Sequence, residues 1–462
     1  MDPRFFPHNT HLDDPAEFRQ RDPQLRLLAR EPLVHEPAML RVLPVDTPGI
    51  YTVGGGRQVG KTTLLKLWMA RLLELGVQPR NVTFLTGELI DDHHVLLRLM
   101  QEQLQESEPS GLRFLLLDEV TYVRDWDRAV KYAADAGMLE RTVVVITGSD
   151  LLVVKEARRR LPGRRGLADK VDFQLQPLSF REAVELKVSP NELSSLLEAT
   201  CKPSPEELDL LFREFDQYLI HGGYLTALND MARHGAIRAA TLCTYSDWIR
   251  GDMGKRGKQE PYLREVLGAL VKRYGSQITW NALGRDLSID HPKTVADYCE
   301  LLASMDAVFI QPALVEDKLC GAPKKARKVT FSDPFIYHAV RAWLSPTGDP
   351  YTMQILPLMD DPEQCSRLVE ACVATQLRRL YPTYYIKSVG EVDVAFVSAG
   401  RFWPVEVKWS RQLRPKDLKQ IRKYENGRIL ARTRSPGALE GVPVQPLPLA
   451  LLRLPWELSA QG

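Results

Sequence analysis

The apolar segment GIYTV at residues 49–53 runs into the glycine-rich stretch GGGRQVGKTT, and a dense apolar segment, LLKLWMARLLEL, follows directly. This succession predicts a strand, a loop and a buried helix. Gly55, Gly60, Lys61 and Thr62 match the pattern G-x-x-x-x-G-K-[ST], in which glycines let backbone N–H groups turn toward phosphate oxygens. A chance glycine-rich turn is the alternative. The sequence therefore predicts a P-loop that contacts phosphate through Gly55, Gly56, Arg57, Gln58, Val59, Gly60, Lys61, Thr62 and Thr63.

A nucleotide site of this kind also needs a strand that ends in acid. In the segment RFLLLDEV, three leucines predict a strand buried on both faces, and Asp118 and Glu119 follow it. We expect Lys61 to reach the β- and γ-phosphates, Thr62 and Asp118 to hold Mg²⁺, and Glu119 to polarise the attacking water. A surface carboxylate is the alternative for Glu119.

Two further apolar segments, residues 81–87 and 142–149, bracket this strand with helical stretches between them. The alternation predicts a parallel sheet with ligands at the carboxyl ends of its strands. Thr147 or Ser149 would then face the γ-phosphate and sense its presence, unless the hydroxyl is only a cap. The arginine-rich stretch that follows suggests Arg164 or Arg165 as an arginine finger for a neighbouring subunit, with a solvated helix face as the alternative.

Five segments in this order resemble one family: GGRQVGKTTLL, LLLDEV, ITGSDLL, LPGRRG and FQLQPLSFREA. They are similar to AAA-type ATPases of archaea and bacteria whose C-terminal half was long labelled a domain of unknown function. The chain departs from that pattern at Gly56, where such proteins often have proline. The resemblance implies ATP as the nucleotide, and the arginine-rich stretch favours a homo-oligomer such as a ring.

The middle of the chain predicts two helical modules. Residues 181–257 read as a helical lid, in which YLIHGGYLTAL (218–228) resembles the family's glycine pair. Residues 258–332 predict a winged helix-turn-helix whose recognition helix begins at Lys293 and Thr294. The next segment has five basic residues and suggests a DNA-binding wing, with contact between domains as the alternative. These residues are Lys318, Lys324, Lys325, Arg327 and Lys328.

Residues 333–462 carry a second acidic pattern. A predicted helix at 367–380 precedes short strands on which Asp393, Glu406 and Lys408 follow the spacing D-x12-E-x-K. Alternation along a strand puts Glu406 and Lys408 on one face. This pattern resembles that of PD-(D/E)xK nucleases, which implies Mg²⁺ or Mn²⁺ held by Asp393, Glu406 and the helical Glu370, with Lys408 activating water. Glu391 and Val392 stand where the usual proline would be, and a degenerate nuclease fold kept for binding is the alternative.

The composition indicates the class of protein and its compartment. Hydrophobic residues make up 44% of the 462 residues and charged residues 26%, which is typical of a globular protein. The six cysteines include no C-x-x-C pair, no long apolar run suggests a membrane span, and the N-terminus lacks a secretion signal. We therefore expect a cytoplasmic protein.

The expected architecture is α/β. It comprises an N-terminal extension (1–30), a P-loop parallel sheet (31–180), a helical lid (181–257), a winged helix (258–332) and an α/β PD-(D/E)xK-like domain (333–462). The expected function is ATP hydrolysis by a protein that acts on DNA, coupled to a metal-dependent nuclease-like domain. An ATP-dependent oligomeric switch or scaffold with a catalytically silent nuclease fold is the alternative.

Overall fold

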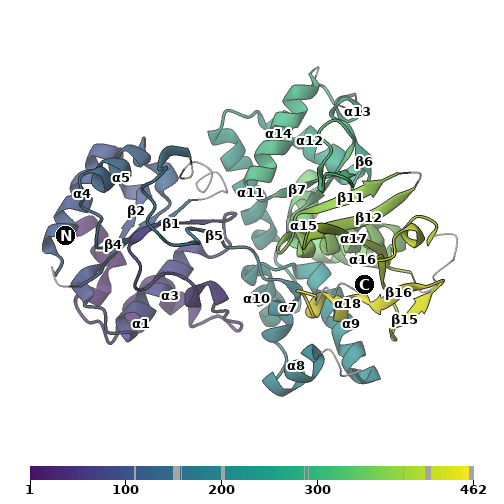
Figure 1. Cartoon of the computed structure of the whole chain (residues 1–462), viewed down its shortest axis with the longest axis horizontal. Coiled ribbons are helices and arrows are strands. Elements are labelled where there is room, and N and C mark those ends of the chain that lie inside the picture. Colours follow the sequence, from purple (N-terminus) through teal and green to yellow (C-terminus); the bar gives the residue numbers. More distant parts are fainter. Residues whose placement is uncertain are drawn as a thin grey trace. The chain divides into compact units, whose positions relative to one another are not determined.

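The structure is a computed structural model that describes residues 1–108, 111–148, 157, 159–198, 203–285, 287–289, 291–388, 390–410 and 418–456 (Figure 1). The chain divides into two compact units. The first consists of residues 1–176 with 304–306, and the second of residues 177–303 with 307–462. The lid, winged-helix and nuclease-like modules expected from the sequence thus lie almost entirely in one unit.

The first unit is built on a parallel sheet, as the sequence predicts. Its strand order is β2-β3-β4-β1-β5, so β4 lies between the P-loop strand β1 and the strand β3 that ends in Asp118. The sequence did not predict the short edge strand β5, which pairs with β1. The strands are β1 (Gly49–Gly54), β2 (Val82–Thr86), β3 (Arg113–Asp118), β4 (Thr142–Thr147) and β5 (Asp172–Gln174).

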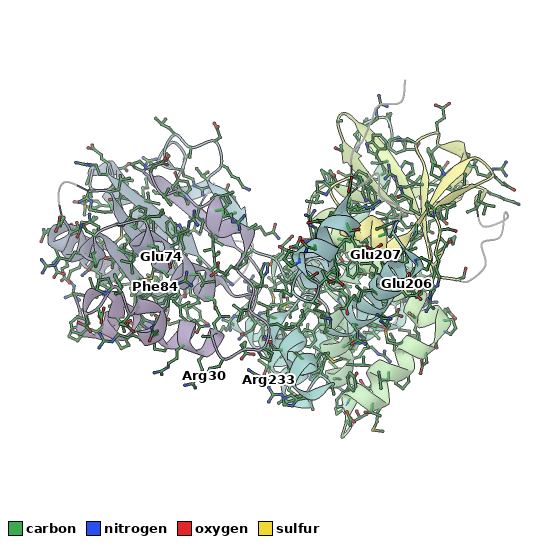
Figure 2. The ribbon with its side chains drawn as sticks, turned by 90° about the horizontal axis from the view of Figure 1, so that it is seen from below. Arg30, Glu74, Phe84, Glu206, Glu207 and Arg233 are labelled. Carbon is green, nitrogen blue, oxygen red and sulfur yellow. The ribbon has the colours of Figure 1, made fainter. Side chains whose placement is uncertain are left out.

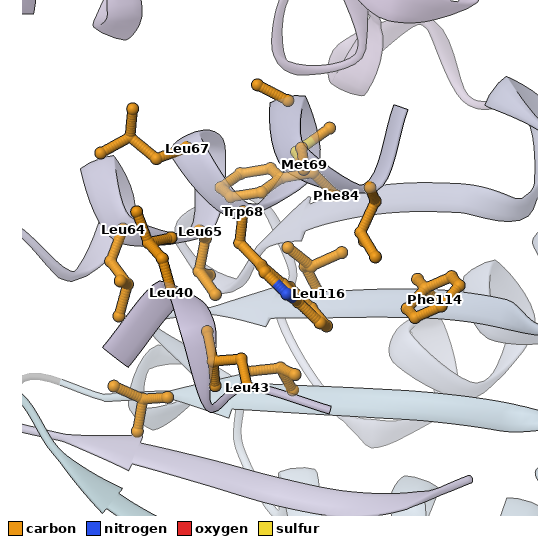
Figure 3. Close-up of a cluster of buried hydrophobic side chains, with 14 of the residues drawn as sticks. Leu40, Leu43, Leu64, Leu65, Leu67, Trp68, Met69, Phe84, Phe114 and Leu116 are labelled. Atoms are coloured by element: carbon orange, nitrogen blue, oxygen red, sulfur yellow. The ribbon is translucent and has the colours of Figure 1, made fainter. Parts of the chain in front are cut away.

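Helices cover both faces of this sheet because its strands are apolar on both sides. Leu115 and Leu117 pack with helices α4 and α5, whereas Phe114 and Leu116 pack with α3. On the α3 face Trp68 meets Phe114 edge to face, with 5.7 Å between ring centroids (Figure 3). The helices of this unit are α1 (Phe18–Arg21), α2 (Pro23–Leu28), α3 (Lys61–Glu74), α4 (His93–Glu106) and α5 (Trp126–Asp135).

The segment 1–30, which the sequence predicts as an N-terminal extension, packs on this sheet. Phe5 is part of the hydrophobic core on the α4 side. The Asn9 side chain exchanges hydrogen bonds with the backbone of Phe84 in β2, at 2.8 and 2.9 Å. Lys66 of α3 forms a buried ion pair with Asp22 at 3.0 Å. These residues make the N-terminal segment an integral part of the first unit.

The second unit begins with helices whose ends are encoded locally. Helices α7, α8 and α9 each start at a serine followed three residues later by glutamate, and each pair forms a capping box. Glu206 and Glu207 lie together at the start of α9 (Figure 2). The helices are α7 (Phe180–Glu185), α8 (Pro190–Leu197), α9 (Pro205–His221), α10 (Leu225–His234), α11 (Ala239–Lys255), α12 (Glu260–Lys272), α13 (Trp280–Gly284), α14 (Pro292–Ser304), α15 (Pro334–Leu344), α16 (Leu356–Asp360), α17 (Pro362–Arg378) and α18 (Leu447–Leu452).

The glycine pair after α9 has a steric cause. A Cβ on Gly222 would come within 1.7 Å of the Asp333 carboxylate, and one on Gly223 within 2.1 Å of the Leu178 carbonyl oxygen. Asp333 caps α15 and also accepts a hydrogen bond from the Gly223 N–H. The pair therefore lets α9 approach the start of α15 closely.

Two main sheets complete the second unit. A small antiparallel sheet has the order β6-β10-β7, and a mixed six-stranded sheet has the order β11-β12-β13-β14-β16-β15. Strands β8 and β9 form a separate two-stranded ribbon. The strands are β6 (Gln277–Ile278), β7 (Val308–Pro312), β8 (Leu314–Val315), β9 (Cys320–Gly321), β10 (Arg327–Phe331), β11 (Thr383–Lys387), β12 (Glu391–Ser398), β13 (Arg401–Lys408), β14 (Arg428–Ala431), β15 (Gly437–Leu439) and β16 (Val442–Pro446).

Among the described helices of both units, none has the length and apolar character needed to cross a membrane.

Candidate functional site

The P-loop joins β1 to the first turn of α3. Gly60 has a φ of 96°, which favours glycine, and a Cβ on Gly55 would lie 2.4 Å from the Leu175 carbonyl oxygen. Lys61 is the first residue of α3 and is 4% exposed. Its Nζ donates to the carbonyl oxygens of Gly55 (3.2 Å) and Gly56 (2.9 Å). The loop therefore surrounds a buried ammonium group at the N-terminus of a helix.

A chain of hydrogen bonds links α3 to the ends of β3 and β4. The Thr62 hydroxyl donates to Asp118 Oδ2 at 2.7 Å, and the Thr147 hydroxyl donates to Asp118 Oδ1 at 2.6 Å. Thr147 Oγ1 also accepts the N–H of Glu119 at 3.0 Å. Both carboxylate oxygens of Asp118 are thus oriented by threonine hydroxyls. The sequence suggested Thr147 as a phosphate sensor, whereas its hydroxyl holds the acidic pair.

Glu119 lies at the same edge in a strained backbone conformation. Its φ of 51° is in the left-handed region, which is uncommon for residues other than glycine. Its Oε1 lies 3.6 Å from Lys61 Nζ, and its buried Oε2 has no hydrogen-bond partner among the described residues. Burial raises the pKa of Glu119, Asp118 adds to this effect, and the charge of Lys61 opposes it. A buried carboxylate with one unsatisfied oxygen is suited to accept a proton or a water hydrogen bond.

The remaining loop residues lie around this centre. Arg57 donates to the Tyr122 hydroxyl at 2.5 Å, just beyond the end of β3. The Thr63 hydroxyl accepts a 2.9 Å hydrogen bond from Gln24 of the N-terminal segment. Gly56 is buried, Gln58 is exposed, and Val59 packs against the core on the α3 side. Ser149 lies outside the described residues.

The two candidate arginine fingers have different environments. Arg165 is 9% exposed, forms a 2.6 Å ion pair with Asp172, and donates to the carbonyl oxygens of Ile50 and Val171. It therefore joins the edge strand β5 to β1, and its burial corrects the expectation that it reaches a neighbouring nucleotide. Arg164 is partly exposed and pairs with Asp135 at the end of α5, at 2.5 Å.

A carboxylate cluster occupies the second unit. Glu370 of α17 and Glu391 and Asp393 of β12 each offer an oxygen, and these atoms lie within 4.8 Å of one another. The sequence predicted Glu370 and Asp393 as metal ligands but gave Glu391 no role, because it occupies the position of the usual proline. Burial and the charge of Asp393 raise the pKa of Glu370 to about 7, against the opposing charge of Lys328.

Glu406 and Lys408 of β13 lie beside this cluster. Lys408 Nζ is 2.6 Å from Glu406 Oε1, and the Glu406 Oε2 is buried with no hydrogen-bond partner in the described part of the chain. Burial raises the pKa of Glu406 to about 8, to which the charges of Asp393 and Glu370 contribute. Asp393 Oδ2 accepts the Val407 N–H at 2.9 Å, which ties β12 to β13 at this point. The structure thus brings together Glu370, Asp393, Glu406 and Lys408.

One cation in this cluster was not predicted. Lys328 of β10 is 1% exposed, and its Nζ lies 2.5 Å from Glu370 Oε1 and 2.5 Å from Glu391 Oε1. Burial alone would lower the pKa of Lys328, but Glu370, Asp393 and Glu391 together raise it. The sequence assigned Lys328 to a DNA-binding wing, and its burial corrects that assignment. No local pattern distinguishes Lys328 from its basic neighbours.

The other basic residues expected at a nucleic-acid interface are more accessible. Lys318, Lys324 and Lys325 are exposed, and so is Lys293 at the start of α14. The Arg327 guanidinium lies 4.5 Å from the centroid of the Trp280 ring. Gln420 is buried, and its side-chain oxygen accepts the Gly390 N–H at 3.1 Å, one residue before Glu391.

Comparisons with known proteins match two regions of the chain. Residues 47–184 match a family described as an AAA domain, and residues 212–347 match a domain of unknown function, DUF8612. The second match ends before Glu370 and so does not cover the carboxylate cluster. A curated relative from Haemophilus influenzae, described as an uncharacterized protein, is 25% identical over 267 residues. That alignment covers 56% of this chain and 60% of the relative.

Solved structures give a more distant likeness. A Walker-type ATPase of Pyrococcus abyssi aligns with 63% of this chain and 91% of its own, at 14% identity and a TM-score of 0.42. The ORC1 protein of Aeropyrum pernix, solved in complex with DNA, aligns with 69% of this chain and 93% of its own, at 16% identity and a TM-score of 0.33. The family match and the site geometry agree on one conclusion. Residues 47–184 form an AAA-type P-loop ATPase domain.

Proposed function

We propose that the protein binds and hydrolyses ATP, acts on DNA, and couples nucleotide-driven conformational change to a metal-dependent nuclease-like site. The observation that carries the ATPase part is the hydrogen-bonded series Thr62, Asp118, Thr147 and Glu119. It brings a metal-binding hydroxyl, a metal-binding carboxylate and a general base to one edge of the sheet, beside Lys61.

The donor set suits Mg²⁺. Thr62 and Asp118 offer oxygen ligands from two elements, and oxygen is the ligand that Mg²⁺ prefers in proteins. The ion would neutralise charge on the phosphates, while Lys61 exchanges its carbonyl partners for phosphate oxygens. Glu119, whose pKa is raised by burial, would orient water and accept its proton.

We propose DNA as the partner of the second unit. Residues 258–332 have the element order helix, strand, helix, helix and then four strands, and the sheet β6-β10-β7 beside these helices suits a winged helix. Lys293, at the start of α14, and Lys324 and Lys325, before β10, are exposed and available to phosphate. Between Lys408 and Arg434 the sequence adds ten basic residues against two acids.

The carboxylate cluster is the proposed nuclease-like site. Glu370, Asp393 and Glu406 would hold Mg²⁺ or Mn²⁺, and Lys408 would orient the attacking water. The support is that helix α17 and strands β12 and β13 bring these side chains together, with one buried oxygen of Glu406 left without a hydrogen-bond partner among the described residues.

The test uses the full chain with ATP, Mg²⁺ or Mn²⁺ and assorted DNA. Wild type is compared with Lys61→Ala and Lys408→Ala. We expect hydrolysis that Lys61→Ala abolishes and DNA cleavage that Lys408→Ala abolishes. Absence of ATP hydrolysis by wild type, with and without DNA, contradicts the ATPase proposal. Absence of cleavage with either metal contradicts the nuclease proposal.

One observation favours a second candidate, an ATP-dependent oligomeric switch or scaffold with a silent nuclease fold. Lys328 forms ion pairs with two members of the cluster, and its ammonium group supplies positive charge that a metal would otherwise provide. In this candidate Arg164 acts on the nucleotide of a neighbouring subunit in a homo-oligomer. ATP-dependent assembly without cleavage, measured by light scattering, would support it.

A further inference from the structure

The carboxylate cluster contains more acids than bases. Four carboxylates, those of Glu370, Glu391, Asp393 and Glu406, face the ammonium groups of Lys328 and Lys408. The Glu406 Oε2 is buried without a hydrogen-bond partner in the described part of the chain. Carboxylates held close together and partly or fully buried need cations or protons, so this set is suited to a further positive charge.

Lys328 reaches the cluster from a different sheet. Strand β10 pairs with β6 and β7, and Lys328 lies opposite Gln277 on one side and Gln311 on the other. Gln277 donates to Glu391, while Gln311 donates to the carbonyl oxygens of Tyr384 (2.8 Å) and Asp393 (3.2 Å). One row of side chains across the small sheet therefore contacts β11 and β12.

A second contact fixes the segment that leads to Lys328. The Tyr385 hydroxyl of β11 donates a 2.6 Å hydrogen bond to the Ala326 carbonyl oxygen, two residues before Lys328. The Lys328 ammonium group lies 5.5 Å from the centroid of the Tyr385 ring. The segment that leads to Lys328 is therefore held against β11.

We infer that Lys328 is a built-in cation that occupies the carboxylate site in competition with a divalent metal ion. Its Nζ lies between oxygens of Glu370 and Glu391, two of the three residues whose oxygens are close enough to share one ion. A hard divalent ion would bind Glu370 and Asp393 in exchange for the ammonium group, with Glu391 or Glu406 as a further oxygen ligand. Metal binding then requires the Lys328 ammonium group to leave Glu370 and Glu391.

The inference rests on the metal role proposed for this cluster, and its readout is metal binding. A protein that binds metal here without cutting DNA would overturn the proposed cleavage and leave the inference standing. The probe is Mn²⁺, titrated into the full chain without nucleotide and followed by electron paramagnetic resonance of the free ion. The variants are Lys328→Met and, as a matched control, Lys272→Met, which removes an exposed lysine of the same unit.

We expect Lys328→Met to bind Mn²⁺ about tenfold or more tightly than wild type, because the competing charge is gone. Lys272→Met should match wild type, and adding Asp393→Asn to Lys328→Met should remove the gained site. Equal or weaker Mn²⁺ binding by Lys328→Met would overturn the inference.

Lys328→Met leaves the partly buried carboxylates of Glu370 and Glu391 without their cation and is at risk of misfolding. The double variant Lys328→Met/Glu391→Gln removes one charge of each sign and keeps the cluster at the wild-type net charge. It retains Glu370, Asp393 and Glu406, so we expect it also to bind Mn²⁺ more tightly than wild type. Failure of the folded double variant to do so would equally overturn the inference.

Discussion

The Thr147 hydroxyl donates a 2.6 Å hydrogen bond to Asp118, and the same oxygen accepts the N–H of Glu119. Strand β4 lies between the P-loop strand and the strand that ends in Asp118, so its last residue contacts both acids. We interpret Thr147 as a positioning residue for the metal ligand and the general base.

Thr147→Val should lower the turnover of ATP by about tenfold to a hundredfold, as loss of a partner that orients a ligand typically does. The dissociation constant for ATP should change little, because Lys61 and the loop are intact. Thr142→Val is the matched control, since Thr142 is equally buried on β4 and its hydroxyl has no hydrogen-bond partner in the described part of the chain. Equal turnover in the two variants, measured by phosphate release, would contradict the role of Thr147.

Glu119→Gln should bind ATP and fail to hydrolyse it. Loss of a general base lowers turnover by about 10²–10⁴-fold. Affinity for ATP should rise, because Lys61 no longer has the Glu119 carboxylate at 3.6 Å as a competing partner. Binding of a fluorescent ATP analogue and phosphate release measure the two effects. Glu88→Gln serves as the control, because it removes an exposed carboxylate near Glu119. Undiminished ATP hydrolysis by Glu119→Gln would exclude Glu119 as the general base.

Arg165→Ala and Arg164→Ala should affect stability differently. Arg165→Ala leaves the partly buried Asp172 without its ion-pair partner and should lower the free energy of unfolding by about 3–5 kcal/mol. Arg164→Ala breaks a more exposed pair with Asp135 and should lower the free energy of unfolding far less. Denaturant unfolding of the two variants checks this difference, and similar losses would contradict the structural role of Arg165.

The buried His11 should make the first unit sensitive to acid. His11 is fully buried, and its Nε2 lies 2.9 Å from the Val82 carbonyl oxygen. Burial lowers the pKa of His11 to about 4, so between pH 4 and the unfolded pKa of about 6.5 the unfolded state binds more protons. The contribution of neutral His11, about 3 kcal/mol, is present above pH 6.5 and is lost as the pH falls toward 4.

His11→Gln should therefore weaken the pH dependence of thermal unfolding between pH 6.5 and 4. The measurement is the unfolding midpoint of the first unit at each pH, compared with wild type. An unchanged slope in the variant would show that His11 does not titrate in this way.

Lys324→Ala/Lys325→Ala should weaken binding to DNA of any sequence. Each phosphate contact contributes about one unit to the slope of log affinity against log salt, so the double variant should lose about two. Arg98→Ala/Arg128→Ala removes two exposed charges from α4 and α5 and should leave the slope unchanged. Fluorescence anisotropy with labelled DNA at several salt concentrations measures this, and equal slopes in both double variants would contradict a basic wing.

The features that the sequence determined by itself each depend on residues that are close together along the chain. The P-loop, the acidic pair Asp118 and Glu119, and the parallel sheet follow from contiguous residues, because glycine conformations and strand periodicity act over a few positions. The pairing of Glu406 with Lys408 follows from alternation along one strand in the same way.

Only the tertiary structure decided which distant side chains meet. Nothing near Thr147 in the sequence indicates that it holds Asp118, and the burial of Arg165 depends on an edge strand too short to recognise. Phe5 packs in the core of the first unit, and Asn9 hydrogen-bonds to β2. Lys328 of β10 forms an ion pair with Glu370 of α17. The sequence shows which residues can carry a charge. Their burial and their partners depend on packing between segments far apart along the chain.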